Sequence, residues 1–480
     1  MATNGKFTLI QQNDTHAQME LHWEGFWRNG ELEYRKAGGY ARAAAVVKQI
    51  RQEVSAALFV DCGDSIHGTG PAQWTQGACI VPALNAEGIE LLVPGNWEYG
   101  FGPVVLQARI REMQFPVVAC NVEEATTSEK VFAPCEVREL GGVSVGLMGV
   151  TSPIVTQTMP DSFGAGLRFL DPVDVLPNAI AKVRRERGAE LVVVVSHWGF
   201  AQDVQLAQEV QGIDVILSSH THNRLARPVI VGKTIIIQSG FSGSFLGRLD
   251  IEVRHGHVED YQHRLIRVDE AIEPDAGVQR VIDQQLAPYR DQLNEVVGQT
   301  ATPLHRMTVL ESTMDNLITE AYLETTGADI AFSHGWRYGP PVPTGDVTVG
   351  NLWEIIPTNP EIMTVELTGE QVLQRLEANL ESVFAGDTFK QKGGYVMRTS
   401  GLSAIVRLNN PKGTRVEHLD IAGAEMEPDR LYTLAVGGEQ ALQGAEGKPT
   451  GVKAIDALRN YFRKHSPVDA SLTGRKFVAV

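Results

Sequence analysis

Asn13-Asp14-Thr15-His16 is the stretch that decides the fold, and it follows the apolar run of residues 7–10. That run is typical of a short buried strand. An Asp and a His two residues apart, just past a strand end, can point their side chains the same way. A carboxylate oxygen beside an imidazole nitrogen suits Zn, Mn or Fe better than Ca or Mg alone. A single Asp-x-His is most often a capping or surface pair, so it indicates a metal site only if similar polar clusters recur along the chain.

Composition limits the kinds of protein that this chain can be. Its 480 residues exceed one ordinary domain, and the 43% hydrophobic content with many Gly and Pro predicts a globular α/β protein. No apolar run approaches the ~18 residues of a membrane span. The net charge of −16 argues against nucleic-acid or anionic-membrane partners. A small anionic substrate would then need locally placed cations, which metal ions can supply.

The cysteines and the first residues bear on the compartment. Cys62, Cys79, Cys120 and Cys135 are scattered without a metal-type C-x-x-C spacing, which favours a reduced compartment. Residues 1–6 are too polar for a signal peptide. We therefore expect a cytoplasmic protein, or a periplasmic one if the chain is a mature form.

The first half alternates expected strands and helices, and polar residues follow the strand ends. Helices are predicted over residues 40–54 and 174–187. Strands are predicted over residues 57–60, 91–94, 114–120, 143–150, 191–195, 215–217, 229–231 and 234–238. Open α/β sheets place their sites just beyond strand ends.

The polar residues at these strand ends share one chemistry: nitrogen or oxygen donors, with no thiolate. They are Asp14, His16, Asp64, Asn96, His197, His220 and His222. One ion takes about four to six ligands, so seven donors with one shared carboxylate fit two ions ~3.5–4 Å apart. Each residue alone has an ordinary structural explanation in a turn or on the surface. Seven such residues at successive strand ends are much harder to explain that way.

These motifs resemble those of the calcineurin-like metallophosphoesterases, in the 5′-nucleotidase branch. Asn-Asp-Thr-His, Gly-Asp, Gly-Asn-x-Glu, Ser-His-x-Gly and His-x-His occur in the family order. The resemblance implies two divalent metal ions, Mn, Zn or similar, that activate a hydroxide for attack on phosphorus. It implies one ion on Asp14, His16 and His222, the other on Asn96, His197 and His220, and Asp64 as the bridge.

One stretch departs from the family pattern. The family has Gly-Asn-His-Glu, whose His stabilises the transition state or protonates the leaving oxygen, and an Asp two residues past the Glu that orients it. Here Trp97 replaces the His and Gly100 replaces the Asp. An indole donates a hydrogen bond but cannot shuttle a proton, and losing a catalytic acid typically costs ~10²–10⁴-fold.

The departure leaves alternatives open. Sulfate thiohydrolases, a sister branch that this stretch also resembles, have Trp at this position, and their thiolate leaving group departs without help. A thiohydrolase-like reaction on a sulfur substrate is therefore the alternative function. Trp97 could equally pack the wall of the site. The insert of residues 21–33, rich in aromatics, is expected as a loop that stacks on a substrate, forms a lid or packs ordinarily.

The first domain is expected to end with strands over residues 245–253 and 258–268. An acidic linker, 269–274, then leads into a long amphipathic hinge helix over residues 278–297. The second half opens with a capped helix near residue 311 and a strand over residues 328–332.

Three residues of the second half are candidates for substrate binding. Arg337 matches the Arg of the family's Asn-Gly-Gly-x-x-Arg, which binds substrate phosphate, although the Asn-Gly-Gly itself is absent. Tyr395 aligns with an aromatic that stacks on a nucleobase. The second stacking aromatic, expected within residues 436–444, is missing. Arg398 is a further anion-binding candidate, with a strand-surface arginine as the ordinary alternative.

The sequence therefore predicts a two-domain α/β enzyme. Residues 1–268 form a metallophosphoesterase β-sandwich flanked by helices, 269–300 a linker with the hinge helix, and 301–480 a smaller α+β substrate-binding domain. The favoured function is metal-dependent hydrolysis of a phosphate ester, in particular a nucleotide. A metal-retaining protein without catalysis is a third possibility. Oligomeric state is left open. The predicted catalytic residues are Asp64, Asn96 and Arg337, and the predicted substrate contacts are Arg337, Tyr395, Trp97 and Arg398.

Overall fold

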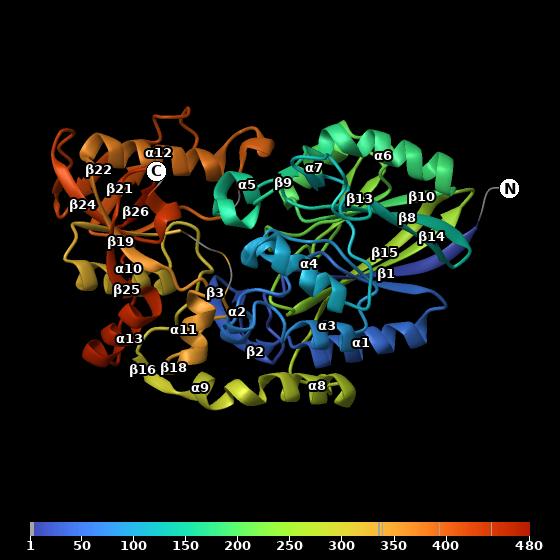
Figure 1. Ribbon diagram of the computed structural model, residues 1–480, viewed down its shortest axis with the longest axis horizontal. Coiled ribbons are helices and arrows are strands. Elements are labelled where there is room, and N and C mark those ends of the chain that lie inside the picture. Colours follow the sequence, from blue (N-terminus) through green and yellow to red (C-terminus); the bar gives the residue numbers. More distant parts are fainter. Residues whose placement is uncertain (1–3, 335–336, 338, 393, 443) are drawn as a thin grey trace. The chain divides into compact units, whose positions relative to one another are not determined.

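The computed structural model describes residues 4–480 except 335–336, 338, 393 and 443, and its chain forms two compact units (Figure 1). The first unit holds the chain up to His22 together with Lys36–Pro288. The second holds Trp23–Arg35 and Tyr289–Val480.

Two sheets form the centre of the first unit. The first has the order β15-β14-β1-β4-β5, and the second β12-β13-β11-β10-β8-β7. Strands β1, β4 and β5 are parallel to one another, as are β8, β10, β11 and β13. The strand bounds are β1 Gly5–Gln12, β4 Ala57–Asp61, β5 Leu91–Leu92, β7 Cys135–Leu140, β8 Val143–Val150, β10 Leu191–Ser196, β11 Val215–Leu217, β12 Val229–Val231, β13 Thr234–Ile237, β14 Phe245–Arg254 and β15 His257–Arg267. A small antiparallel pair, β6 Val122–Glu124 and β9 Leu167–Phe169, completes the unit's strands.

The two sheets pack face to face. Leu9 and Val60 of the first sheet share one buried cluster with Val193 and Leu217 of the second. Helices cover the outer faces: α1, α3 and α8 contribute to the core against the first sheet, and α6 and α7 to the core against the second. In Figure 1, α6 and α7 lie along one side of the sandwich and α1 and α3 along the other. The predicted β-sandwich flanked by helices is confirmed.

The helices predicted over residues 40–54 and 174–187 are present as α1 and α6, with ends close to the predicted positions. The bounds of the helices of this unit are α1 Tyr40–Glu53, α2 Gly70–Trp74, α3 Val81–Glu87, α4 Pro103–Glu112, α5 Val155–Thr158, α6 Pro172–Arg187, α7 Phe200–Glu209 and α8 Ala276–Leu286. The strand predicted over residues 114–120 is wrong, because Pro116 lacks the N–H that a ladder needs. Isolated bridges at Val117 and Val118 stand in its place.

The long hinge helix predicted over residues 278–297 is also wrong. Its first helix ends at Leu286, a short helix α9 covers Arg290–Asn294, and strand β16 begins at Val296. A single 3-10 turn, Ala287–Tyr289, separates the two helices, and Pro288 contributes to the break because it has no backbone N–H to donate to the helical ladder.

The aromatic insert is a β-hairpin rather than the expected loop. Strands β2, His22–Arg28, and β3, Glu31–Ala37, pair with each other and belong for the most part to the second unit. Asn29 and Gly30 turn the chain with φ of 52° and 84°, the geometry of a type I′ turn. The Asn-Gly dipeptide was the sequence signal for this hairpin.

The second unit is built on a five-stranded sheet of order β20-β17-β24-β19-β25, beside a four-stranded sheet, β23-β22-β21-β26. Helices α10, α11 and α13 pack on one face of the larger sheet, and α12 packs on the other. The bounds are β16 Val296–Thr300, α10 Thr313–Thr326, β17 Ile330–Ser333, β18 Gly345–Thr348, α11 Val349–Ile355, β19 Glu361–Thr368, α12 Gly369–Phe384, β20 Arg398–Ser400, β21 Leu402–Val406, β22 Val416–Ile421, β23 Ala424–Glu425, β24 Leu431–Gly437, β25 Lys448–Lys453, α13 Ala454–His465 and β26 Phe477–Ala479. The predicted α+β character is confirmed.

Among the described residues, no helix is long and apolar enough to cross a bilayer.

Candidate metal centre

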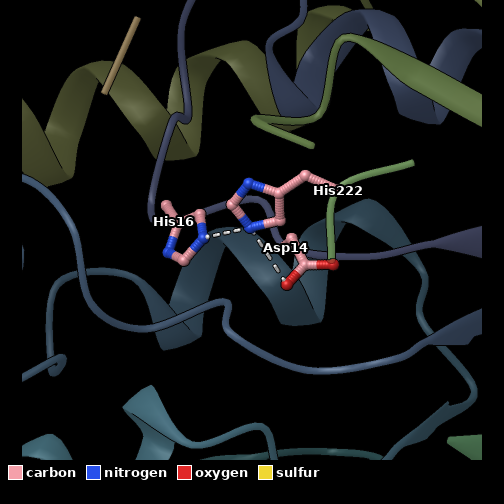
Figure 2. A group of neighbouring side chains, drawn as sticks. All are labelled: Asp14, His16 and His222. Atoms are coloured by element: carbon pink, nitrogen blue, oxygen red, sulfur yellow. Dashed lines mark hydrogen bonds and ion pairs between the residues drawn. The ribbon is translucent and has the colours of Figure 1, made fainter. Parts of the chain in front are cut away.

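The first group of candidate ligands comprises Asp14, His16 and His222 (Figure 2). Asp14 and His16 follow β1, and His222 follows β11. The Nε2 atoms of His16 and His222 are 3.2 Å apart, and Nε2 of His222 lies 3.4 Å from Oδ1 of Asp14. Figure 2 shows the three side chains converging on one point, where one ion could be held.

The second group comprises Asp64, His197 and His220, at the ends of β4, β10 and β11. Nε2 of His197 lies 3.1 Å from Oδ2 of Asp64. The other ring nitrogen of His197, Nδ1, lies 2.6 Å from the carbonyl oxygen of Cys62 and 2.9 Å from the Ser219 hydroxyl. Such partners fix the ring so that Nε2 faces the site.

The two groups adjoin each other, because Nε2 of His197 also lies 3.7 Å from Oδ1 of Asp14. Asn96 follows β5, and its neighbour Trp97 donates its backbone N–H to Oδ1 of Asp64 at 2.7 Å. Oδ1 of Asn96 is buried and has no hydrogen-bond partner among the described residues, whereas Oδ1 of Asp14 and Nε2 of His197 are buried with contacts to the other candidate ligands only. Buried polar atoms without partners are costly, and a metal ion would supply the missing interaction. The donor set therefore fits a pair of divalent cations.

The backbone at these ligands is unusual. Positive φ angles occur at Asp14 (52°), His16 (48°), Asp64 (59°), His220 (70°) and His222 (61°). Left-handed geometry at a non-glycine residue costs about 1 kcal/mol or more and tends to gather at functional sites. The sharp turns after each strand end bring these side chains back toward one point.

Glu98 holds the loops that carry two of the candidate ligands. Its carboxylate accepts the backbone N–H groups of Asp64 at 2.7 Å, Ser65 at 2.6 Å and Gly95 at 2.6 Å. Gly95 must lack a side chain, because a Cβ there would lie 2.2 Å from Oδ1 of Asp64 and 2.6 Å from Cε1 of His197. Sequence reasoning treated Glu98 as part of a motif and missed this role.

Electrostatics in the site favour a cation. Burial disfavours the charged form of His197, yet the carboxylates of Asp64 and Asp14 raise its pKa to about 10. Burial likewise works against the Asp14 carboxylate, but His222 and His197 hold its pKa below the usual range. Burial lowers the pKa of His16 to about 4, which leaves the ring neutral, the form that binds metal. Two buried carboxylates thus attract positive charge to one place.

Trp97 lies against the site and packs on His67, a residue that none of the sequence motifs contains. Its ring, 8% exposed, stacks on the imidazole of His67, with centroids 4.4 Å apart and planes 16° from parallel. The ring of Phe163 meets the indole edge-on at 6.1 Å. The only hint of His67 in the sequence was its place three residues after Asp64.

The predicted substrate residues of the second unit have different surroundings. Arg398 is 2% exposed; its Nε lies 3.5 Å from Asp315, and its guanidinium donates to the carbonyls of Thr308 and Val396. Tyr395 is half-buried, with the Arg398 guanidinium 5.2 Å from its ring centroid. Arg398 is therefore enclosed in its own domain rather than lying on a strand surface.

Arg337 lies after β17 and is half-buried, whereas its neighbours 335–336 and 338 lie outside the described residues. The glycine at position 393, in the segment that precedes Tyr395, is likewise outside them.

Comparison with known proteins identifies the family to which the chain belongs. Residues 7–224 match the family of calcineurin-like phosphoesterases, and residues 296–447 match the 5′-nucleotidase C-terminal domain. The chain belongs to the calcineurin-like phosphoesterases with a 5′-nucleotidase C-terminal domain. The family resemblance inferred from the sequence motifs is confirmed.

Relatives of this phosphoesterase cover most of its length. The trifunctional nucleotide phosphoesterase YfkN of Bacillus subtilis is 25% identical over 86% of this chain, which spans 30% of that protein. The solved structure of the sulfate thiohydrolase SoxB of Thermus thermophilus has a TM-score of 0.93 at 26% identity, covering 100% of this chain and 98% of that one. A 5′-nucleotidase precursor, also of Thermus thermophilus, has a TM-score of 0.87 at 25% identity, covering 99% of each chain.

The phosphoesterase is therefore a metal-dependent hydrolase that acts on ester bonds, as predicted. Both candidate ligand groups belong to the residues that match the phosphoesterase family. Members of this family are hydrolases with two divalent metal ions at the active site. The two groups of candidate ligands give this chain two corresponding metal positions.

Proposed function

We propose that this enzyme hydrolyses phosphate monoesters of nucleotides. The observation that carries the proposal is the approach of His197 to Asp14, 3.7 Å, which joins the two ligand groups into one site. A pair of ions at such a site suits in-line displacement at phosphorus. The 5′-nucleotidase C-terminal domain and the nucleotide-hydrolysing relatives support a nucleotide as the substrate.

Each candidate ligand has a place in this proposal. Asp14, His16 and His222 would hold one ion, Asn96, His197 and His220 the other, and Asp64 would bridge them. Bound Mn, Zn or similar ions lower the pKa of a water molecule and neutralise charge on the phosphoryl group. The chain's own contribution is orientation: the Cys62 carbonyl fixes the His197 ring, and Glu98 fixes the loops of Asp64 and Gly95.

The second unit would recognise the substrate. The guanidinium of Arg337 offers a planar fork that suits the oxygens of a phosphate. The ring of Tyr395 would stack on one face of a nucleobase. The chain has no aromatic among residues 436–444 to stack on the other face. A base held on one side would be bound less tightly than one held on both.

A sulfur substrate is the second candidate, and Trp97 is the observation that favours it. The indole stands where the family has its His, and the SoxB structure resembles this chain at a TM-score of 0.93. A thiolate leaving group needs no protonation, so a site with Trp97 would cleave it without a catalytic acid.

A hydrolysis panel on metal-reconstituted protein tests both candidates. It includes AMP, other nucleoside monophosphates, 4-nitrophenyl phosphate and its bis-ester, and a thiosulfonate, each beside the Asp64→Asn variant. Turnover of AMP that Asp64→Asn removes is the expected result. Turnover of the thiosulfonate without any nucleotide would replace the proposal with the thiohydrolase reaction.

A further inference from the structure

His67 lies where both departures from the family pattern meet. Trp97, in place of the family's His, stacks on the His67 ring with centroids 4.4 Å apart. Gly100, in place of the family's Asp, borders the same ring: a Cβ there would lie 3.2 Å from Cδ2 of His67 and 3.7 Å from its Nε2. A carboxylate side chain at position 100 would compete with the imidazole for that space. His67 thus borders both positions that depart from the family pattern.

The surroundings of His67 connect it to the metal centre. The ring is 2% exposed, as buried as His16 and Asp64, and Phe101 encloses it from another side at 5.3 Å between centroids. The next residue, Gly68, packs directly on His16: a Cβ on Gly68 would lie 2.4 Å from the His16 carbonyl oxygen and 2.8 Å from its Cβ. The segment that carries His67 is therefore built against a candidate ligand.

The protonation state of His67 limits what it can do. Burial lowers the pKa of His67 to about 3, so the ring is neutral near pH 7. A neutral imidazole has one N–H donor and one acceptor nitrogen. Nδ1 is buried and has no hydrogen-bond partner among the described residues, although Gln73 lies close enough to influence the pKa.

We propose that His67 donates a ring N–H to the leaving oxygen of the ester and so replaces the donor that Trp97 and Gly100 have removed. In this step the oxygen of the attacking water forms a bond to phosphorus while the bond from phosphorus to the leaving oxygen breaks. The electron pair of the broken bond goes to the leaving oxygen, and the His67 hydrogen bond stabilises that charge. The proton that neutralises the product comes from water. The inference deepens the proposed function and rests on its ester hydrolysis, not on the nucleotide.

The test compares leaving groups on the metal-reconstituted full chain. His67→Phe keeps a ring against Trp97 but removes both nitrogens. We expect kcat/KM for phenyl phosphate, a poor leaving group, to fall ~10²-fold, the typical cost of one lost transition-state donor. For 4-nitrophenyl phosphate, whose leaving group needs little help, the loss should stay below ~10-fold. Metal content, measured by mass spectrometry, should not change.

Two further variants separate a donor from a packing residue. Phe163→Leu disturbs the contacts of Trp97 without touching the His67 nitrogens, and it should affect both substrates alike. Trp97→His, added to His67→Phe, returns a donor at the family position and should restore most of the phenyl phosphate activity. In the otherwise unchanged chain, Trp97→His should gain less than ~10-fold, because a donor is already present.

Three results would overturn the inference. One is an equal loss on both esters in His67→Phe, and another is no loss on either. The third is a ~10²-fold gain in activity on phenyl phosphate when Trp97→His is the only change. This measurement does not use a variant of His67, so it tests the inference even if His67→Phe does not fold. Failure of the proposed nucleotide specificity would show separately, as turnover of the aryl phosphates without turnover of AMP.

Discussion

His197 and Asp14 come from different strands and different ligand groups, yet Nε2 of one lies 3.7 Å from Oδ1 of the other. This short approach makes the two groups one site. With Asp64 3.1 Å from the same nitrogen, two carboxylates converge on a single imidazole. Such a concentration of buried negative charge is stable when cations neutralise it.

Metal content is the first consequence. We expect two ions per chain in the reconstituted enzyme, and about one in His222→Ala, because only the first group loses a ligand. Activity should fall at least ~10²-fold, since ions act on both the attacking and leaving oxygens. Elemental analysis with parallel rate measurements checks this, and exposed His257→Ala is the matched control. Two ions retained in His222→Ala would remove this residue from the ligand set.

Glu98 provides a second prediction. Its carboxylate accepts four backbone N–H groups, those of Asp64, Ser65, Ile66 and Gly95. Glu98→Gln places an amide NH₂ group among backbone N–H donors, so we expect the loops to shift. Metal affinity should then drop ~10–100-fold, the usual effect of changing a residue that orients metal ligands. Competition with a metal-binding dye measures the affinity. Exposed Glu112→Gln should leave it unchanged, and an unaltered affinity in Glu98→Gln would mean that the loops hold without the carboxylate.

Gly95 is the subject of a third prediction. One methyl group at this position would come within 2.2 Å of Oδ1 of Asp64 and 2.6 Å of Cε1 of His197. Gly95→Ala must therefore displace a ligand on each side, and we expect it to lower kcat at least ~10²-fold, because small misplacements cost that much. Gly386→Ala, where nothing lies within 4 Å of the added atom, is the control. Wild-type rates in Gly95→Ala would show that the loops can move apart at no cost.

Much of the fold and the ligand set could be predicted because the signals are local. Apolar runs mark β1, β8 and β10, and the polar residues that follow β1 and β10 supply candidate ligands. The two wrong predictions, a strand over residues 114–120 and a helix over residues 278–297, had local causes as well. Pro116 and Pro288 each interrupt a pattern that apolar spacing alone would continue. The Asn29-Gly30 turn was readable but was overlooked among the aromatics around it.

What the sequence could not provide was contact between distant residues. Stacking of His67 on Trp97 depends on how two loops meet, and no spacing along the chain records it. The same holds for Arg398, which looked like a surface arginine of a strand. Its pairing with Asp315 follows from packing of α10 on the sheet of the second unit.

Asp315 leads to the fourth prediction. This carboxylate is fully buried between two arginines, with Oδ1 3.4 Å from Nε of Arg306 and Oδ2 3.5 Å from Nε of Arg398. Asp315→Asn would leave two buried guanidinium groups without their counter-ion, which typically costs ~3–5 kcal/mol. Hydrogen exchange of the α10 amides in the full chain measures this, and exposed Asp346→Asn is the control. Unchanged exchange in α10 would mean that the arginines find other partners.

The pH dependence of the same group follows from its pKa. Burial would raise the pKa of Asp315, but Arg306 and Arg398 lower it below the usual value. Because the folded pKa lies below the unfolded one, the stabilisation is present above about pH 4 and is lost as the pH falls through the folded pKa. The difference in α10 exchange between wild type and Asp315→Asn, corrected for intrinsic rates, should therefore be constant from about pH 5 to 7 and shrink toward acid. A difference that grows on acidification would mean that the folded state holds Asp315 protonated, against the pairing with Arg306 and Arg398.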